Sequence, residues 1–417
     1  MPVHLLLFYL TLIFLPTQLG LHTWPNWALI LGRRIDYLSP TLFFTDILLL
    51  LTLCFWIIFQ KKCSVSKKQI IIMLGIFLVM VINTLFTASP LVAGYKWIKI
   101  IECIWFGYYL YKVKPALRTT TLMLSLGAAY SSILGLLQFY LQHSLGGIFW
   151  FLGERTFTVM TPGIARVNWC WLMTNQCQEL LRPYATFSHP NVLAGFLIIV
   201  MFLLGYNLQT EKIKKFRLWS YGVLGLSFVT ILITFSRNAW ITGICAVLFL
   251  VLFSKKKFKN RNIVWLGILL LACVGVLLPY FLTLFFGGES VAIRYSLAIA
   301  ALHLFFTHPL MGVGLGGFLI QLPSVSTTRD LFFIQPVHNI FLLWIVETGI
   351  LGCVTVGLLL RKYIAFLKVH KTPTIVTIPL ILILMLGLFD HYPFTLQQGQ
   401  LLFTLCVALP FLYFKNS

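Results

Sequence analysis

Long apolar stretches recur along this chain, separated by short polar connections. A run of about 20 apolar residues is long enough to cross the hydrocarbon layer of a membrane as a helix. The pattern predicts twelve such helices, over residues 3–17, 38–60, 69–88, 91–111, 118–141, 186–208, 218–235, 238–254, 263–286, 338–360, 373–390 and 397–414. The first is short and ends near a proline, so eleven helices is the alternative. We therefore expect an all-α membrane protein in which residues 1–417 form a single integral membrane domain.

Two of the predicted connections are much longer than the others, over residues 142–185 and 287–337. The second contains an amphipathic stretch over residues 291–306, so we expect that connection to be partly helical. Long connections in compact folds are usually functional. These two connections are therefore the first places to look for a site.

The composition agrees with a membrane protein, because 59% of the residues are hydrophobic and only 10% are charged, against about 25% charged in soluble domains. The net charge is +21, but the basic residues are concentrated in alternate connections: 61–68, 112–118, 209–217, 255–261, 361–371 and the C-terminal tail. Such a bias marks the cytoplasmic side. We therefore expect both chain termini to be cytoplasmic, and a lipid bilayer with anionic headgroups, rather than nucleic acid, as the partner of these charges.

Two features of the termini and the cysteines add to this picture. No basic residue precedes the first apolar stretch and no A-x-A-like site follows it, so we expect a first membrane helix rather than a cleaved signal peptide. Cys170 and Cys177 lie in one polar connection. They could be bonded in an oxidising compartment or remain free, and the sequence leaves both possibilities open.

The remaining connections contain arginine and no lysine. Arginine grips phosphate with two parallel hydrogen bonds, whereas lysine acts as a point charge. For most of these residues, anchoring of helix ends at lipid headgroups is the simpler explanation. The residues are Arg33, Arg34, Arg155, Arg166, Arg182, Arg237, Arg294 and Arg329.

Three polar residues at predicted membrane boundaries on the outer side are candidates for catalysis. His338 begins a predicted helix and can act as a general base near neutral pH. Arg237 begins another, where the helix N-terminus adds to its attraction for anions, and Arg294 lies in the second long connection. Each has a bland explanation alone, but together they suit a diphosphate leaving group and a nucleophile that must lose a proton. The outer connections contain no acidic cluster such as DxD, so we expect neither a metal nor a cofactor.

Further polar residues are candidates for substrate binding. Lys96, Lys99 and Glu102 are spaced three residues apart in the fourth predicted helix, and charges there should face the bundle interior or a cavity. The two lysines could bind a lipid phosphate or serve in a structural ion pair. Asn339 follows His338 directly and could position a substrate or orient the imidazole ring.

Five phrases of this chain, in their order, resemble those of the O-antigen ligase and polymerase superfamily. They are RPYATFSHPN (182–191), TFSRNAW (234–240), HPLMGVG (308–314), HNIFL (338–342) and ETGILG (347–352). The resemblance implies a metal-independent glycosyltransferase that uses an undecaprenyl-diphosphate-linked glycan outside the cytoplasmic membrane. It assigns the essential arginines to Arg237 and Arg294 and the catalytic histidine to His338. We also assign substrate binding to Arg182, His189 and Asn191 of the first phrase.

The resemblance leaves the acceptor open. A ligase would transfer the glycan to lipid A core, as in lipopolysaccharide biosynthesis, and a polymerase would transfer it to another lipid-linked glycan. Protein O-glycosylation is a third option, although such enzymes usually carry an extra C-terminal outer region that this sequence lacks after Ser417. A polytopic transporter or lipid-linked glycan flippase is the alternative from another class. Twelve helices and two cytoplasmic termini suit it, but few carboxylates lie near the middle of the membrane and no half-helix breaks are evident.

The orientation can be tested by accessibility labelling of single cysteines. We expect positions 61–68, 209–217 and 255–262 to react only from the cytoplasmic side, and positions in 142–185 and 287–337 only from outside. Reaction of a cysteine at position 329 from the cytoplasmic side alone would contradict the predicted topology and would place the candidate site in the wrong compartment.

Overall fold

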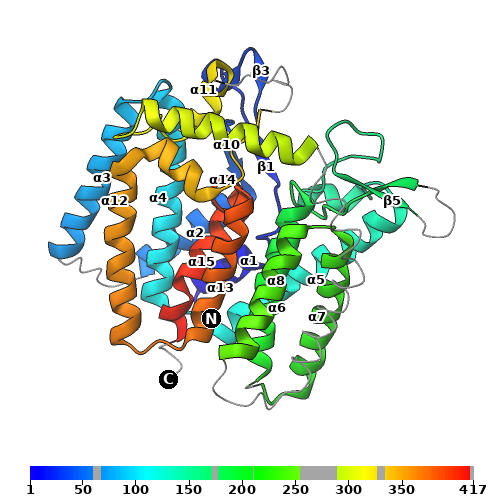
Figure 1. Ribbon diagram of the computed structural model, residues 1–417. Helices are drawn as coiled ribbons and strands as arrows, with labels where there is room; N and C mark the ends of the chain where they lie inside the picture. Colours follow the sequence, from blue (N-terminus) through cyan, green and yellow to red (C-terminus); the bar gives the residue numbers. More distant parts are fainter. Residues whose placement is uncertain (60–66, 171–176, 210, 254–288, 326–333, 414–417) are drawn as a thin grey trace.

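The structure is a computed structural model, and it describes residues 1–59, 67–170, 177–209, 211–253, 289–325 and 334–413. Most of these residues are in α-helices that run along one common direction (Figure 1). The helices are α1 (Val3–Ile13), α2 (Phe44–Phe59), α3 (Lys67–Leu85), α4 (Pro90–Val113), α5 (Leu117–Leu141), α6 (Pro190–Leu208), α7 (Lys214–Ile233), α8 (Arg237–Phe253), α10 (Glu289–Thr307), α11 (Gly317–Val325), α12 (Ile340–Val369), α13 (Thr374–Phe389), α14 (Tyr392–Thr395) and α15 (Gln397–Tyr413).

Each predicted membrane segment within the described residues coincides with one helix, and the segment 263–286 lies outside them. By length and composition, α5, α6, α7 and α12 are able to cross a membrane. Several other helices, including α1, α2 and α13, are apolar but shorter. The mostly helical membrane architecture is therefore confirmed, while the number of crossings stays a prediction.

Some helix boundaries differ from the prediction for local reasons. Residues 41–43 form a strand instead of the start of α2, because they pair with residues 20–22. Residues 186–189 precede α6, which begins at Pro190 in its first turn, where a proline needs no hydrogen-bond partner for its nitrogen.

Short antiparallel strand pairs and 3₁₀ turns occupy the connections at the upper end of the molecule in Figure 1. They are β1 (Gly20–His22) with β4 (Thr41–Phe43), β2 (Leu29–Ile30) with β3 (Arg33–Arg34), β5 (Arg166–Cys170) with β6 (Cys177–Leu181), η1 (Asn26–Ala28) and η2 (Gly147–Leu152). The register of the last pair places Cys170 opposite Cys177, and Cys177 is disulfide-bonded. Both long connections predicted from the sequence contain regular structure.

Helix α6 lies at the centre of the main hydrophobic core. Its residues are almost all apolar or small, and most are buried among α5, α7, α8 and α13. A helix that is apolar on every side is expected where neighbours surround it completely. The N-terminus of α6 is therefore held in place by packing, and the polar residues directly before it are positioned with it.

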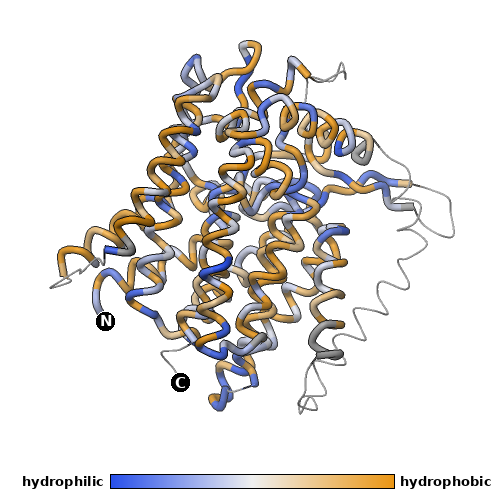
Figure 2. The backbone as a smooth tube through the Cα atoms, turned by 60° about the vertical axis from the view of Figure 1, so that its left-hand side comes forward, coloured by the Kyte–Doolittle hydropathy of each residue, from blue (hydrophilic) through white to orange (hydrophobic). Residues whose placement is uncertain are grey.

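Polar connections gather at the two ends of the helices (Figures 1 and 2). The connections 211–213 and 370–373, each with one lysine, lie at the end that also holds the start of α1 and the end of α15, and α10, α11 and the strands lie at the opposite end. The predicted topology, with the basic connections on one side of the membrane and the long connections on the other, requires such an arrangement. The orientation in a membrane remains a prediction.

Helix α12 is interrupted at Gly349, whose φ of 64° and ψ of −165° are not helical. The segment 309–314 supplies the missing hydrogen bonds. The Ile350 and Leu351 N–H groups donate to the carbonyls of Pro309 and Leu310, and the Val346 and Glu347 carbonyls accept from Val313 and Gly314. A break in a membrane helix is tolerated when neighbouring groups replace its hydrogen bonds in this way.

The break makes a sharp prediction about stability. A Cβ atom at position 349 would lie 2.4 Å from the Leu310 carbonyl oxygen, and its backbone region is accessible almost only to glycine. Gly349→Ala should lower the free energy of unfolding by about 2 kcal/mol or more. Gly357→Ala in the same helix is the matched control, because a Cβ there meets nothing within 4 Å. Equal thermal unfolding temperatures for the two variants in detergent would contradict this account.

Candidate active site

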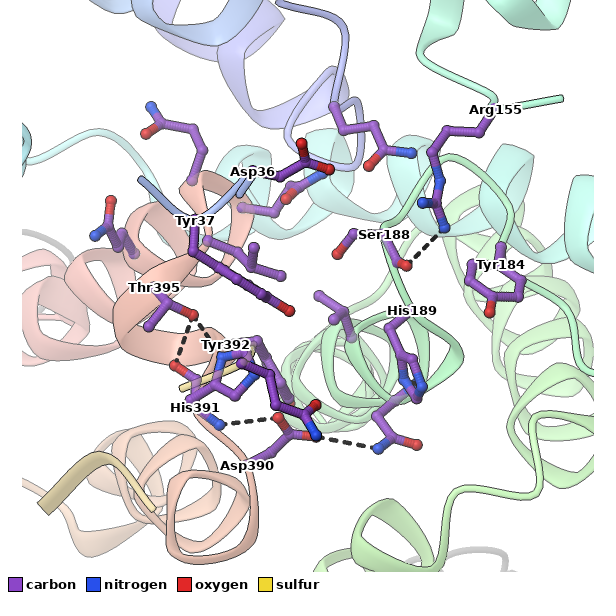
Figure 3. Close-up of a pocket in the computed structure, with 18 of the residues that line it drawn as sticks. Asp36, Tyr37, Arg155, Tyr184, Ser188, His189, Asp390, His391, Tyr392 and Thr395 are labelled. Carbon is purple, nitrogen blue, oxygen red and sulfur yellow. Dashed lines mark hydrogen bonds between the residues drawn. The ribbon is translucent and has the colours of Figure 1, made fainter. Parts of the chain in front are cut away.

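A cavity of about 1040 Å³ lies in the half of the molecule that contains the long connections (Figure 3). Its walls come from helices that are far apart in the sequence, from the strand region 18–43, and from the turn between α13 and α14. The wall contains all three catalytic candidates and five of the six substrate-binding candidates: His338, Arg237, Arg294, Arg182, His189, Asn191, Lys96 and Lys99.

Four of the outer arginines line this one cavity. Arg237 begins α8, directly after the turn at Phe235, and Arg294 lies on α10, where its Nη1 donates to the Phe389 carbonyl at 3.1 Å. Arg182 donates through Nε to the Thr234 carbonyl at 2.6 Å. Arg155 donates to the Ser188 carbonyl at 2.9 Å, as Figure 3 shows. Headgroup anchoring therefore does not explain these four residues.

The segment that presents Arg182 is held by the side chain of Gln138 on α5. The Gln138 amide oxygen accepts from the N–H groups of Tyr184 and Ala185, and its nitrogen donates to the Ala185 carbonyl and to Glu154. Glu154 in turn accepts from two backbone N–H groups, those of residues 145 and 146. One buried amide thus fixes both halves of the first long connection.

Arg182 is itself buried in charged surroundings. Its Nη2 donates to Asn191 Oδ1 at 2.8 Å. Burial, with the neighbouring charges of Arg237 and Arg294, lowers the pKa of Arg182 to about 10. The guanidinium is still charged at neutral pH, and three cations therefore interact in this cavity, with Asp390 as the described carboxylate that acts on Arg182.

Asp390 follows α13 and connects three elements. Its Oδ2 accepts from Asn191 Nδ2 on α6 at 3.0 Å, and its Oδ1 accepts from the His391 N–H at 2.8 Å. His338 Nδ1, just before α12, lies 3.6 Å from Oδ1, within ion-pair distance. Burial opposes the charge, but the interactions with His338 and the positive surroundings hold the pKa of Asp390 well below its usual range.

His391 forms the other side of this group. Its ring centroid lies 5.1 Å from that of His338 and 5.2 Å from that of Tyr37, and its Nδ1 is 2.7 Å from Thr395 Oγ1. Burial lowers the pKa of His391 to about 3, although Asp390 opposes this shift. His391 is therefore neutral at physiological pH and gains a proton only in strong acid.

His189 caps α6 rather than standing free in the cavity. Its Nδ1 accepts from the Asn191 N–H at 3.1 Å, and burial, reinforced by Arg182, lowers its pKa to about 3. A neutral, hydrogen-bonded ring of this kind positions Asn191, which bridges Arg182 and Asp390.

The two lysines have different surroundings. Lys99 is paired with Asp46 at 2.7 Å and with Glu102 at 2.6 Å. Gln397 also bonds to both carboxylates, so these residues join α2, α4 and α15. Lys96, one turn earlier on α4, makes no hydrogen bond or ion pair with any described residue.

Asn339 does not line the cavity. Its side-chain oxygen accepts from the N–H groups of Phe341 and Leu342, which caps α12, and its nitrogen donates to the Leu388 carbonyl. The cap fixes the start of the helix directly after His338. None of these hydrogen bonds involves the His338 ring, so both roles expected for Asn339 stay predictions.

Asp390 and His391 were not selected from the sequence as site residues. The adjacent acid and histidine at the end of an apolar segment were the available signal. Their position beside His338 depends on the packing of α12 against α13, which sequence spacing does not reveal. Tyr37, whose ring extends toward His391 in Figure 3, gave no signal.

Among the described residues, His338, Asp390 and His391 form the one group that could ligate a metal ion. Their ligand atoms lie within 4.8 Å of one another, and two imidazoles with a carboxylate are suitable donors for a transition metal. Against this, both carboxylate oxygens of Asp390 already accept hydrogen bonds, and Arg294 is close enough to act electrostatically on His391.

The comparisons with known proteins agree with this geometry. Residues 222–357 match the family model of the O-antigen ligases. Over 220 residues the chain is 26% identical to the general O-oligosaccharyltransferase of Acinetobacter baylyi, a match that covers 46% of this chain and 37% of that protein. No solved structure matches the chain. The matched segment contains Arg237, Arg294 and His338, so the chain is similar to the O-antigen ligases over the part that holds the three catalytic candidates.

Proposed function

We propose that this protein transfers a glycan from an undecaprenyl-diphosphate carrier to an acceptor hydroxyl on the outer side of the cytoplasmic membrane. The observation that carries the proposal is the convergence of Arg182, Arg237 and Arg294 with His338 and Asp390 in one cavity. A family of glycan ligases and a relative named for oligosaccharide transfer support the same class of reaction.

The arginines are suited to hold the diphosphate of the donor. Arg294 uses one N–H on the Phe389 carbonyl, and a guanidinium has five N–H donors, so most of its donors remain for a ligand. Arg237 stands at the N-terminus of α8, where the backbone dipole adds to the attraction for an anion. Charge that develops on the leaving diphosphate would be stabilised by donors already in place.

His338 is suited to act as the general base. Asp390 faces its Nδ1 and, when Nδ1 carries the proton, stabilises the tautomer in which Nε2 is basic. Nε2 lies 3.3 Å from Gln335 Oε1, to which it can only donate, so this contact must be replaced by the acceptor hydroxyl before Nε2 can accept a proton. Asp390 would then act as a positioning residue that also stabilises the imidazolium after proton transfer.

The proposed reaction is a single displacement. The acceptor oxygen gives its proton to His338 and forms a bond with the anomeric carbon of the donor sugar. The bond between that carbon and the diphosphate oxygen breaks, and undecaprenyl diphosphate leaves with the electron pair. One displacement inverts the configuration at the anomeric carbon, and none of these steps requires a metal.

The acceptor decides between a ligase of lipopolysaccharide biosynthesis, a polymerase of a surface polysaccharide and a protein O-glycosylating enzyme. The arrangement around His338 fits transfer to a hydroxyl in all three. We favour the ligase-like reaction because the family match covers the segment with the catalytic candidates.

Substitution of the cavity arginines tests the donor site. Arg237→Ala and Arg294→Ala should each raise the barrier to transfer by about 2–4 kcal/mol, since charge-assisted bonds are lost where water is excluded. Arg237→Lys should also be impaired because lysine cannot form the paired bonds. Arg118→Ala is the control, since Arg118 pairs with Glu211 and lies outside the cavity. Full transfer activity in Arg237→Ala membranes would remove Arg237 from the mechanism.

Substitution of the His338–Asp390 pair tests the base. His338→Ala should reduce the transfer rate by roughly two to four orders of magnitude with donor binding retained. Asp390→Asn should give a smaller loss in rate. His303→Ala and His308→Ala are controls, because neither residue lines the cavity. The rate of transfer should be unchanged by EDTA, because the proposed steps use no metal. Inhibition by EDTA that added Zn²⁺ reverses would instead assign a metal to His338, Asp390 and His391.

A further inference from the structure

Lys96 is a cation in the cavity wall for which the described residues provide no direct partner. It lines the main cavity, and its Nζ lies over the ring of Tyr95, 5.5 Å from the centroid. No carboxylate of the described residues is within 4 Å of it. An ammonium group held away from bulk water without an anion is costly, so an unpaired lysine in a cavity points to an anionic ligand.

The nearest acid does not fill this role. Glu347 is close enough to act on Lys96 electrostatically, but no ion pair within 4 Å joins the two, and the backbone at Gly316 and Phe318 also interacts with its carboxylate. A second cavity of about 30 Å³, large enough for about one water molecule, has both Lys96 and Glu347 in its wall. Lys96 therefore stands between this small cavity and the main one, and its charge is available to the main one.

Lys99 provides the internal comparison. It is one turn away on the same helix, and two carboxylates and a glutamine surround it, so its charge is fully used within the protein. The contrast shows that α4 carries two lysines with different surroundings. Lys99 joins neighbouring helices through ion pairs, and Lys96 lines the main cavity without an ion pair.

The wall around Lys96 is rich in groups that suit a sugar. Gln400, Thr41 and Tyr95 line the same cavity, and Gln400 also lines the small cavity together with Lys96. Gln397 and Gln398 also line it and are buried, yet Gln397 Oε1 and Gln398 Nε2 have no hydrogen-bond partner among the described residues. Buried amide atoms without partners need an explanation, and hydrogen bonds to the hydroxyl groups of a bound sugar would provide one.

This region is separate from the arginine group. Among the described residues, Glu347 and Lys99 act electrostatically on Lys96, and the small cavity that Lys96 and Glu347 line has none of the three arginines in its wall. The cations of the main cavity thus form two groups, Lys96 on α4 and the arginines at residue 182, on α8 and on α10. His338 and His391 line the same cavity. A donor diphosphate needs only one of them.

We propose that the Lys96 region is the acceptor subsite, and that the accepted glycan carries an anionic group, a carboxylate or a phosphate, that binds Lys96. This inference rests on the proposed function, since it assigns the second substrate of the same reaction. The anion on the acceptor holds it opposite the donor and directs a neighbouring hydroxyl toward His338. Lys96 is then a determinant of acceptor specificity and takes no part in proton transfer.

The test measures two kinds of ligand on the full chain in lipid nanodiscs. Saturation-transfer NMR would compare methyl β-glucuronide and glucose 6-phosphate with the neutral methyl β-glucoside, and inorganic pyrophosphate would report the donor site. The wild type should bind at least one of the anionic sugars about tenfold or more tightly than the neutral one, as expected for one charge-assisted contact. The preferred anion tells whether a carboxylate or a phosphate is recognised.

Matched variants separate the two sites. Lys96→Gln should abolish the preference for the anionic sugar and leave pyrophosphate binding unchanged, and Lys96→Arg should restore the preference. Arg237→Ala should do the reverse, losing pyrophosphate and keeping the sugar preference. Lys112→Gln, at the far end of α4 and outside the cavity, should change neither. Retained pyrophosphate binding also shows that Lys96→Gln is folded.

Three outcomes would overturn the proposals, and each has a distinct meaning. A wild type that binds the anionic and neutral sugars equally contradicts the acceptor assignment and leaves the donor site intact. Loss of pyrophosphate binding in Lys96→Gln with retention in Arg237→Ala would give Lys96 to the donor instead. Absence of pyrophosphate binding in the wild type would contradict the proposed function itself.

Discussion

A buried carboxylate organises the candidate site. Asp390 carries a charge in a place where water is scarce, so the protein must surround it with donors, and it takes them from three different elements. Asn191 belongs to the start of α6, His391 to the turn before α14, and His338 to the start of α12. Each of these starts is thereby placed relative to the others. The cost of leaving the charge unpaired fixes the distances among residues that are up to 199 positions apart.

The helices supply rigidity, but the site itself is made by connections. The cavity wall is formed at helix starts and in the segments between helices, where backbone groups and polar side chains are available. These segments are held by specific devices: Gln138 for the first long connection, Asn191 for the approach to α6, and the 309–314 segment inside the break of α12. A membrane-embedded helix bundle needs such hydrogen-bonded contacts, because apolar packing between helices does not position a polar connection.

The sequence reveals some of this arrangement and hides the rest for a physical reason. Apolar run length reports helices directly, so the helices lie where the sequence predicted them, but residues 38–43 and 186–189 are not helical and α12 continues past its predicted end at residue 360 to Val369. Arg237 and His338 stood out because charge is rare at such boundaries. Asp390 did not, since its meaning depends on a contact between α12 and α13 that no local pattern encodes. Lys96 and Lys99 looked equivalent in spacing, and only the positions of Asp46 and Gln397 distinguish them.

The hydrogen bonds of Gln138 limit which residues could replace it at this position. Its amide uses both its donor and acceptor capacity at once, on Tyr184, Ala185 and Glu154. A glutamate in its place would face Glu154 with a second negative charge, an asparagine would be one methylene too short, and an apolar residue would remove all four of these hydrogen bonds. Position 138 lies outside the segment 222–357 that the family model matches. We therefore expect a glutamine near the end of the helix before the first long connection to be a useful reference point for aligning the N-terminal parts of related chains.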